Sequence, residues 1–302
     1  MTSDFNTPDT QLSEADFTDL KGRSLWADAR GRLLRNRAAV LSIVVLGLIA
    51  LLCMVGPWLS PHAYDRVYWE HIASPPDWEA GFYFGTDSNG RDLFVRTLMG
   101  GRVSLLVGIV ATFVALVIGV SYGAIAGYQG GRTDNLMMRL VDILYSLPFM
   151  FFVILLMVYF GRNLVLIFVA IGAVEWLDMA RIVRGQTLSL KQREFIEAAQ
   201  ACGVSNRRIV LRHIIPNVVG PVVVFMTLLV PKVILFESFL SFLGLGVQEP
   251  MTSWGVLISD GARQMEAYPW MLIFPALFLA MTLLCLNFIG DGIRDALDPK
   301  DR

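Results

Sequence analysis

The apolar residues of this chain are gathered in long uninterrupted runs, not spread at the three-to-four-residue spacing of an amphipathic helix. The runs 38–59 and 103–126 contain no Asp, Glu, Lys or Arg. At about 1.5 Å per residue, helices of these lengths are long enough to cross a hydrocarbon core about 30 Å thick. The pattern therefore predicts an all-α, polytopic membrane protein.

Four further apolar segments complete a predicted set of six transmembrane helices. The spans are expected at residues 38–59, 103–126, 136–160, 164–180, 218–236 and 270–290. The apolar region 218–247 is too short for two crossings, which need roughly 40 residues, so it is counted as one span. Its surplus, from residue 237 onward, is expected at the membrane interface. A polar leader, 1–37, and a short tail, 291–302, flank the spans.

The basic residues predict the orientation of the spans. Eighteen Lys and Arg residues fall on the side of the leader and six on the other side, with Lys232 inside a span. This bias places both termini in the cytoplasm, together with the loop 181–217 between spans four and five. The long polar leader precedes the first apolar run, so that run is expected to stay as an anchor and not to be removed as a signal peptide.

Composition and motifs exclude several function classes. The chain is 55% apolar and 17% charged, with a net charge of −1, which gives no indication of nucleic-acid binding. None of its lysines stands in a P-loop motif and there is no GxSxG elbow, so no catalytic residue is predicted and the chain is not expected to be an enzyme by itself.

Histidines and cysteines predict no metal site. His62 and His71 have no HExxH or CxxH partner and are interpreted as solvated surface residues. The cysteines, Cys53, Cys202 and Cys285, have no CxxC spacing and are interpreted as small buried residues.

A few charged residues remain inside the predicted spans. Arg139 and Asp142 are three apart on one helical face, so a local ion pair is expected. Glu175 and Asp178 lie toward the cytoplasmic end of span four. Lys232 is expected to extend outward by default, although it could instead line a polar pathway with Glu237.

The loop 181–217 is polar and favours helix. Residues 189–203 predict a short helix, with Ser189 as a possible N-cap and Gly203 as the left-handed residue that ends it. A stripe of Phe195, Ala199 and Cys202 is expected to pack on the bundle and to leave Glu197 on another face.

A second helix is predicted after Gly203. Ser205 is a possible cap for it, and Pro216 either closes this helix or leads into span five. From the residues alone, the loop is either a surface on which another protein docks, oriented by the charge of Glu197, or a helical connector along the membrane.

A family resemblance favours docking. Glu197, Ala198 and Ala199, followed by Gly203 and then by "HIIP" at 213–216, resemble the EAA motif of permease subunits in binding-protein-dependent ABC importers. His213 departs from the general motif, which prefers an aliphatic residue there, but the peptide-importer branch commonly has "RHI".

Other stretches are similar to the same branch. They are "FGTDSNGRDLFVRTLMGGRVSL" at 84–105, "ESFLSFLGLGVQEPMTSWG" at 237–255, the "GRSLW" of the leader and the "ALDPKDR" of the tail. Together they make nearly the whole chain resemble the OppC-type permease subunits of oligopeptide importers, in the peptide/opine/nickel permease family.

The resemblance implies a set of partners in the bacterial inner membrane. It implies a second, related permease subunit of the OppB type, two cytoplasmic ATPases that use ATP and Mg²⁺, and a periplasmic binding protein that delivers peptide. Glu197, Ala198 and Ala199 would then lie in the helix that couples to an ATPase, Gly203 would supply its turn, and Pro216 would restart span five. No cofactor is implied for this chain itself.

Two alternatives remain open at this stage. An ion-driven secondary transporter could use Glu175, Asp178 and Glu237 as proton or sodium carriers, but it predicts internal repeats and broken helices near the midplane, and no clear repeat is present. A membrane scaffold without a transport role explains the spans but not the loop.

Overall fold

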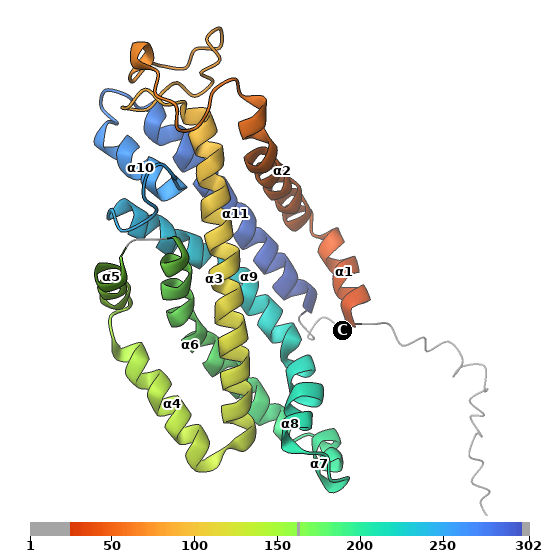
Figure 1. Cartoon of the computed structure of the whole chain (residues 1–302). Helices are drawn as coiled ribbons and strands as arrows, with labels where there is room; N and C mark the ends of the chain where they lie inside the picture. The colour runs from red at the N-terminus through yellow and green to blue at the C-terminus, as the bar shows by residue number, and fades with distance from the viewer. Residues whose placement is uncertain (1–24, 162–163, 298–302) are drawn as a thin grey trace, which may run out of the picture.

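The computed structural model describes residues 25–161 and 164–297, and all regular elements within them are helices apart from two isolated bridges. The predicted leader and tail fall partly outside these ranges. The long helices form one elongated bundle (Figure 1). Its α-helices are α1 (Leu25–Arg35), α2 (Arg37–Leu59), α3 (Leu93–Gln129), α4 (Gly131–Ser146), α5 (Phe149–Phe160), α6 (Leu164–Lys191), α7 (Glu194–Ala201), α8 (Asn206–Ile209), α9 (Ile215–Phe242), α10 (Trp254–Arg263) and α11 (Trp270–Leu297).

Four continuous helical segments of the described residues are long and apolar enough to cross a membrane, so the chain is a multi-pass membrane protein. They are α2, α3, the segment 206–242 that ends in α9, and α11. The bent pair of α4 and α5 makes a fifth if it is counted as one span. The predicted number of six is therefore only approximate.

The third predicted span, 136–160, is not one straight helix. Its two halves, in α4 and α5, are bent by 84° relative to each other. The break falls at Pro148, and the residue before it, Leu147, has an extended backbone with ψ 133°. Proline disfavours helical geometry in the residue that precedes it, which ends α4 at this point.

Several helices extend beyond their predicted bounds. Helix α3 begins at Leu93, ten residues before the apolar run, because the Asp92 side chain caps it by accepting from the Phe94 N–H at 2.9 Å. Helix α6 continues past residue 180 to Lys191, and α9 continues past residue 236 to Phe242. The surplus that was expected at the interface is thus partly helix.

Helix α3 lies at the centre of the bundle and packs closely on α6 (Figure 1). Gly119, Gly123 and Gly127 are spaced four apart and all face α6. A Cβ atom at Gly119 would lie 2.5 Å from Cβ of Met179, and one at Gly123 would collide with the Ala180 carbonyl oxygen. Small residues at this spacing let the two backbones approach each other.

Helix α2 is joined to α3 by a hydrogen bond to a backbone carbonyl of α2 that has no donor within its own helix. Pro57 has no N–H, so the carbonyl of Cys53 has no helical donor four residues later. Nε of Arg102, on α3, donates to that carbonyl at 2.6 Å. An internal proline is thereby accommodated without breaking α2.

The two ends of the bundle differ in what they carry. Helices α7 and α8 lie at the end where α3 stops and α4 starts, whereas α10 and the loop between α2 and α3 lie at the opposite end (Figure 1). The loop 181–217 of the sequence prediction is shorter than expected, because its first eleven residues belong to α6.

Candidate functional site

Helix α7 carries the EAA residues and begins later than predicted. Ser189 is not its N-cap, because Ser189 lies within α6. The N-cap is Arg193, which has an extended backbone, and the first helical residue is Glu194. The chain bends between Lys191 and Glu194, so the predicted helix 189–203 is split between two elements.

The end of α7 is the turn that the sequence predicts. Gly203 has φ +74°, in the left-handed region that favours glycine. Its N–H donates to Gln200 at 2.9 Å, and the N–H of Val204 donates to Ala199 at 3.1 Å. These two bonds form a Schellman motif, which satisfies carbonyls at the end of the helix.

The face of α7 that contacts the bundle differs from the predicted stripe. Ile196 is fully buried and Ala199 is half-buried, whereas Phe195 and Cys202 are exposed. The stripe of Phe195, Ala199 and Cys202 is therefore wrong, and so is the prediction that Cys202 is buried. Phe195 and Ile196 both lie between Glu194 and Glu197, so the sequence offers no signal that singles out Ile196.

The motif residues themselves are presented outward. Glu197 and Ala198 are exposed, and Ala199 next to them is half-buried. Helix α7 therefore exposes a carboxylate and a small side chain on a low-relief surface, while Ile196 packs against the bundle. A partner can approach such a surface closely.

Tyr128, near the end of α3, holds the elements around α7 together. Its carbonyl accepts from Nζ of Lys191 at 2.7 Å, and its hydroxyl donates to the Asn206 side chain at 3.0 Å. The Gln200 amide donates to the same hydroxyl at 3.4 Å. Sequence reasoning missed Tyr128, because its partners come from α6, α7 and α8.

The predicted second helix is not separate from span five. Residues 206–242 run as one continuous helical segment, with a π-helical turn at Val210–Ile214 between α8 and α9. Ser205 occupies the N-cap position, but its side chain makes no capping hydrogen bond. Pro216 lies directly after the π-helical turn, in the first turn of α9, and the helix continues beyond it, so Pro216 leads into the span and does not close a helix.

His213 lies within the π-helical turn and is half-buried. Its carbonyl oxygen accepts from Nδ2 of Asn217 at 2.6 Å. The stretch from α7 to the start of α9 contains Glu197, Ala198, Ala199, Gly203, His213 and Pro216, and its helices α7 and α8 lie at one end of the bundle (Figure 1).

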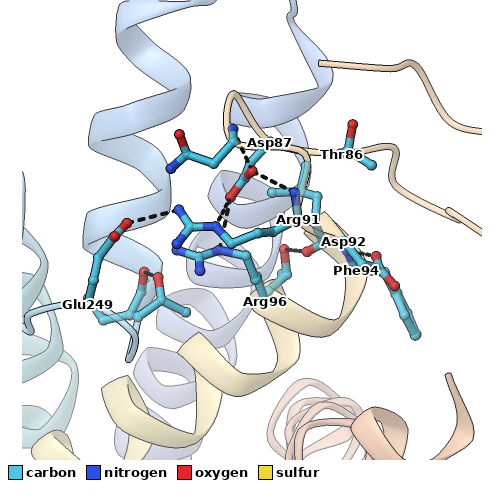
Figure 2. Close-up of polar contacts among 12 residues, drawn as sticks. Thr86, Asp87, Arg91, Asp92, Phe94, Arg96 and Glu249 are labelled. Atoms are coloured by element: carbon cyan, nitrogen blue, oxygen red, sulfur yellow. Dashed lines mark hydrogen bonds and ion pairs between the residues drawn. The ribbon is translucent and has the colours of Figure 1, made fainter. Parts of the chain in front are cut away.

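A cluster of charged residues lies at the opposite end of the molecule from α7 (Figure 2). The Asp87 carboxylate accepts from Nε of Arg91 at 2.8 Å and lies 3.3 Å from Nε of Arg96. Nη2 of Arg91 also donates to Glu249 at 2.9 Å. Asp87, Arg91 and Arg96 are buried, so the cluster joins the loop before α3 to the connection between α9 and α10.

The pKa values outside the spans follow from these contacts. Burial alone would lower the pKa of Arg91, but hydrogen bonds and charges from Glu249 and Asp87 outweigh it and raise this pKa. The hydrogen bond from Arg91 lowers the pKa of Glu249. Burial raises the pKa of Asp92, against the opposing effect of its hydrogen bond from Phe94.

Glu237 neither extends outward nor lines an open pathway in this structure. Its carboxylate is fully buried and accepts from the hydroxyls of Ser104 at 2.9 Å and Ser241 at 2.7 Å. The Trp254 N–H donates to the same Ser104 hydroxyl at 3.3 Å. Glu237 therefore connects α9, α3 and the start of α10.

Two other predictions about charges within the spans are wrong. Lys232 does not extend outward, because its Nζ donates to Glu175 at 2.9 Å and to Asp178 at 3.4 Å. Asp142 pairs with Arg181 of α6 at 2.8 Å and not with Arg139 on its own helix. In both cases the partner comes from another helix.

The histidines of the outer loop are less solvated than predicted. His62 is half-buried, stacks on Phe82 with ring centroids 4.2 Å apart, and bonds the Tyr68 hydroxyl at 2.9 Å. His71 is also half-buried. In the part of the chain that the structure describes, no group of three or more His, Cys, Asp or Glu residues could hold a metal ion.

Comparisons with known proteins identify the family of this chain. Residues 119–302 match the model of the binding-protein-dependent transport system inner membrane component. The chain belongs to this family. Residues 24–76 also match the N-terminal TM domain of oligopeptide transport permease C.

Curated relatives cover almost the whole chain. The oligopeptide transport system permease protein OppC of Haemophilus influenzae is 58% identical and covers 99% of this chain and 100% of its own. OppC of Escherichia coli K12 is 65% identical over 94% of each chain. The dipeptide transport system permease protein DppC of Bacillus subtilis is 45% identical over 96% of this chain and 90% of its own.

The fold is shared with a solved importer. A chain of the inward-facing MetNI methionine ABC transporter has a TM-score of 0.54 at 20% identity, and the match covers 68% of this chain and 96% of that one. The match to the family model and the names of the curated relatives, which are permeases and not enzymes, make the chain a permease subunit of an ABC importer.

Proposed function

We propose that this chain forms the translocation path for oligopeptides in an ATP-driven importer, and that α7 couples it to separate ATPase subunits. The chain lies in the bacterial inner membrane with both termini in the cytoplasm. The observation that carries the proposal is that α7 is anchored by buried Ile196 while Glu197 and Ala198 stay exposed at the end of the bundle.

The charge distribution supports this orientation. The leader side of the sequence holds eighteen Lys and Arg residues against six on the other side, and α7 lies on the leader side of the alternating spans. Helix α7 then faces the compartment that contains ATP. Helix α7 contacts α3 through the hydrogen bond from Gln200 to the Tyr128 hydroxyl and through the buried side chain of Ile196, so a movement of α7 can be passed on to the bundle.

The partners proposed are those that the family resemblance implies. We assign the chain to a complex with a second, related permease subunit of the OppB type, two cytoplasmic ABC ATPases and a periplasmic peptide-binding protein. ATP and Mg²⁺ are used by the ATPases, and this chain binds neither. Lipid surrounds the outward apolar faces, such as those of α2 with Leu41, Leu48 and Leu51 exposed.

An oligopeptide is the favoured cargo because the relatives that are 58% and 65% identical are named for oligopeptide transport. At lower identity the names do not separate the two cargoes, since the Bacillus subtilis relatives named for oligopeptide and for dipeptide transport are 43% and 45% identical. The ion-driven alternative has no support from the relatives, which are permeases of ABC systems. Two of the acids on which it depended, Glu175 and Asp178, contact Lys232.

The test is transport by the purified complex in proteoliposomes. The chain, its co-purifying permease and ATPases and the binding protein are reconstituted, and uptake of a labelled peptide is measured with ATP, with a non-hydrolysable ATP analogue, or with an imposed proton or sodium gradient. We expect uptake only with ATP and only when the binding protein is present. Uptake driven by the ion gradient without ATP would refute the proposal.

A further inference from the structure

Three charged side chains meet between α6 and α9, deep within the helices. Nζ of Lys232 lies 2.9 Å from Glu175 and 3.4 Å from Asp178. Lys232 precedes the end of α9 by ten residues, which is about 15 Å along a helix. Because α6 continues to Lys191, Glu175 and Asp178 lie near the middle of this helix, not toward its end as the sequence predicted.

The cluster is not sealed inside the chain. The Glu175 side chain is 4% exposed, but the side chains of Asp178 and Lys232 are 30% and 43% exposed. Charged groups in contact with acyl chains are strongly unfavourable, so this surface does not face lipid. It faces water or another subunit.

The polar surface continues along α6 toward α7. Glu175, Asp178 and Arg181 are three residues apart and share one face of the helix. The Arg181 side chain is 39% exposed, pairs with Asp142 of α4 at 2.8 Å and lies over the ring of Tyr145 at 4.2 Å.

Beyond these charges, α6 still exposes polar residues, Gln186 and Ser189, before it ends at Lys191. The exposed face of α2 is different, because it shows large apolar residues such as Leu41, Leu48 and Leu51. A polar face that runs from the middle of a span to its end is typical of the wall of a water-filled path.

We propose that this face of α6 and α9 lines the peptide path, and that Asp178, with Glu175 behind it, receives the amino-terminal ammonium of the passing peptide. The two carboxylates face a single ammonium, that of Lys232, so the cluster has a formal charge of −1 and attracts a further cation. An amino-terminal ammonium is shared by peptides of any sequence, so this contact suits varied cargo. The inference rests on the proposed function in peptide import.

The first test measures accessibility in the assembled complex. In a chain with Cys53, Cys202 and Cys285 replaced by alanine, a single cysteine is introduced as Asp178→Cys or, as the control, as Ile109→Cys, whose site on α3 is 61% exposed and apolar. We expect a cationic methanethiosulfonate reagent to modify the first and not the second, and transported tripeptide to slow the modification. If both cysteines are equally unreactive, or if the tripeptide gives no protection, the proposal is wrong.

The second test isolates the charge. ATP-driven uptake is measured for two tripeptides of one sequence, with a free and an acetylated amino terminus, chosen so that the wild-type complex carries both. We expect Asp178→Asn to reduce uptake of the free peptide by about three- to fivefold, as for one partly solvated ion contact, and to leave the acetylated peptide unchanged. Asp178→Glu should restore most of the uptake.

The outcomes separate this inference from the proposed function. An equal loss for both tripeptides, or no loss for either, would overturn the assignment of Asp178 to the ammonium. If the wild-type complex carried no unmodified peptide with ATP, so that no such pair of tripeptides could be chosen, the proposed import of peptides would fail instead, whatever the labelling of Asp178→Cys shows.

Discussion

Nη2 of Arg91 donates to the carboxylate of Glu249 at 2.9 Å, although the two residues are 158 positions apart in the sequence. Arg91 lies in the loop before α3 and Glu249 in the connection between α9 and α10 (Figure 2). This pair therefore joins two outer segments that are far apart in the sequence. Because Arg91 lowers the pKa of Glu249, the strength of the tie depends on pH.

The first prediction concerns this pH dependence. The pKa of Glu249 in the folded chain is below its ordinary value of 4.5, so its ionised carboxylate stabilises the fold at pH above 4.5. That contribution is lost as the pH falls through the lowered pKa. We expect Glu249→Gln to reduce the melting temperature near neutral pH, and the difference from wild type to shrink toward zero in strong acid.

The measurement is thermal unfolding of the detergent-purified chain, followed by tryptophan fluorescence across this pH range. Glu266→Gln is the matched control, because Glu266 is an exposed carboxylate on the same end of the molecule. It should leave the melting temperature unchanged throughout. A pH-independent effect of Glu249→Gln would show that the ion pair with Arg91 is not what stabilises the fold.

The second prediction concerns the contact between α3 and α6. A side chain at Gly123 would meet the backbone of Ala180, and backbone cannot move aside as a flexible side chain can. We expect Gly123→Leu to cost on the order of 1–3 kcal/mol in the free energy of unfolding, by forcing the two helices apart. Gly47→Leu is the control, since a Cβ at Gly47 on α2 meets nothing within 4 Å.

The comparison uses the melting temperature and the fraction of monodisperse protein after size-exclusion chromatography in detergent. Gly123→Leu should lower both, and Gly47→Leu should lower neither. Equal behaviour of the two variants would mean that α3 and α6 are not held at close approach by their glycines.

The transmembrane helices could be predicted from the sequence. A charge-free run that is long enough to cross the bilayer must satisfy its backbone hydrogen bonds internally, and a helix does so. The break in the third span could not be predicted. Proline also occurs within α2 at Pro57, within α9 at Pro221 and Pro231, and within α11 at Pro275, and those helices continue through it. Proline restricts the residue before it at each of these positions, so the sequence does not distinguish Pro148, where a helix ends, from the prolines that lie within helices.

In the loop 181–217, too, some features could be predicted from the sequence and others could not. The positive φ of Gly203 was predictable, because a glycine after a short helical pattern is a strong local signal. The choice of Ile196 over Phe195 as the buried residue was not, because it depends on the angle at which the chain leaves α6. Likewise, the partners of Lys232 lie 57 and 54 positions away and are set by how α6 and α9 pack.

The third prediction concerns the charge on α7. Glu197 is exposed, so Glu197→Lys should leave the fold intact and disturb only an interaction with a partner. We expect it to reduce ATPase co-purification and ATP-driven peptide uptake by about fivefold or more, and Glu197→Gln to reduce them less, because reversal adds repulsion to the loss of attraction.

The control for charge reversal is Glu266→Lys, at the opposite end of the bundle, which should keep the ATPases bound. Lys191 would be a poor control although it precedes the motif, because its Nζ donates to the Tyr128 carbonyl at 2.7 Å. Normal ATPase binding and uptake by Glu197→Lys would leave α7 as a simple connector.

The last prediction tests whether the position of α7, which the turn at Gly203 sets, matters apart from the charge of Glu197. A Cβ at Gly203 meets nothing within 4 Å, so the only obstacle to a side chain there is the φ of +74°. Gly203→Val should cost about 1–3 kcal/mol in local strain, whereas Gly203→Asn should cost less, because asparagine is enriched in this backbone region. We expect ATP-driven uptake at matched membrane abundance to fall in the order wild type, Gly203→Asn, Gly203→Val. If valine is tolerated as well as asparagine, the turn at Gly203 does not set the position in which α7 meets its partner.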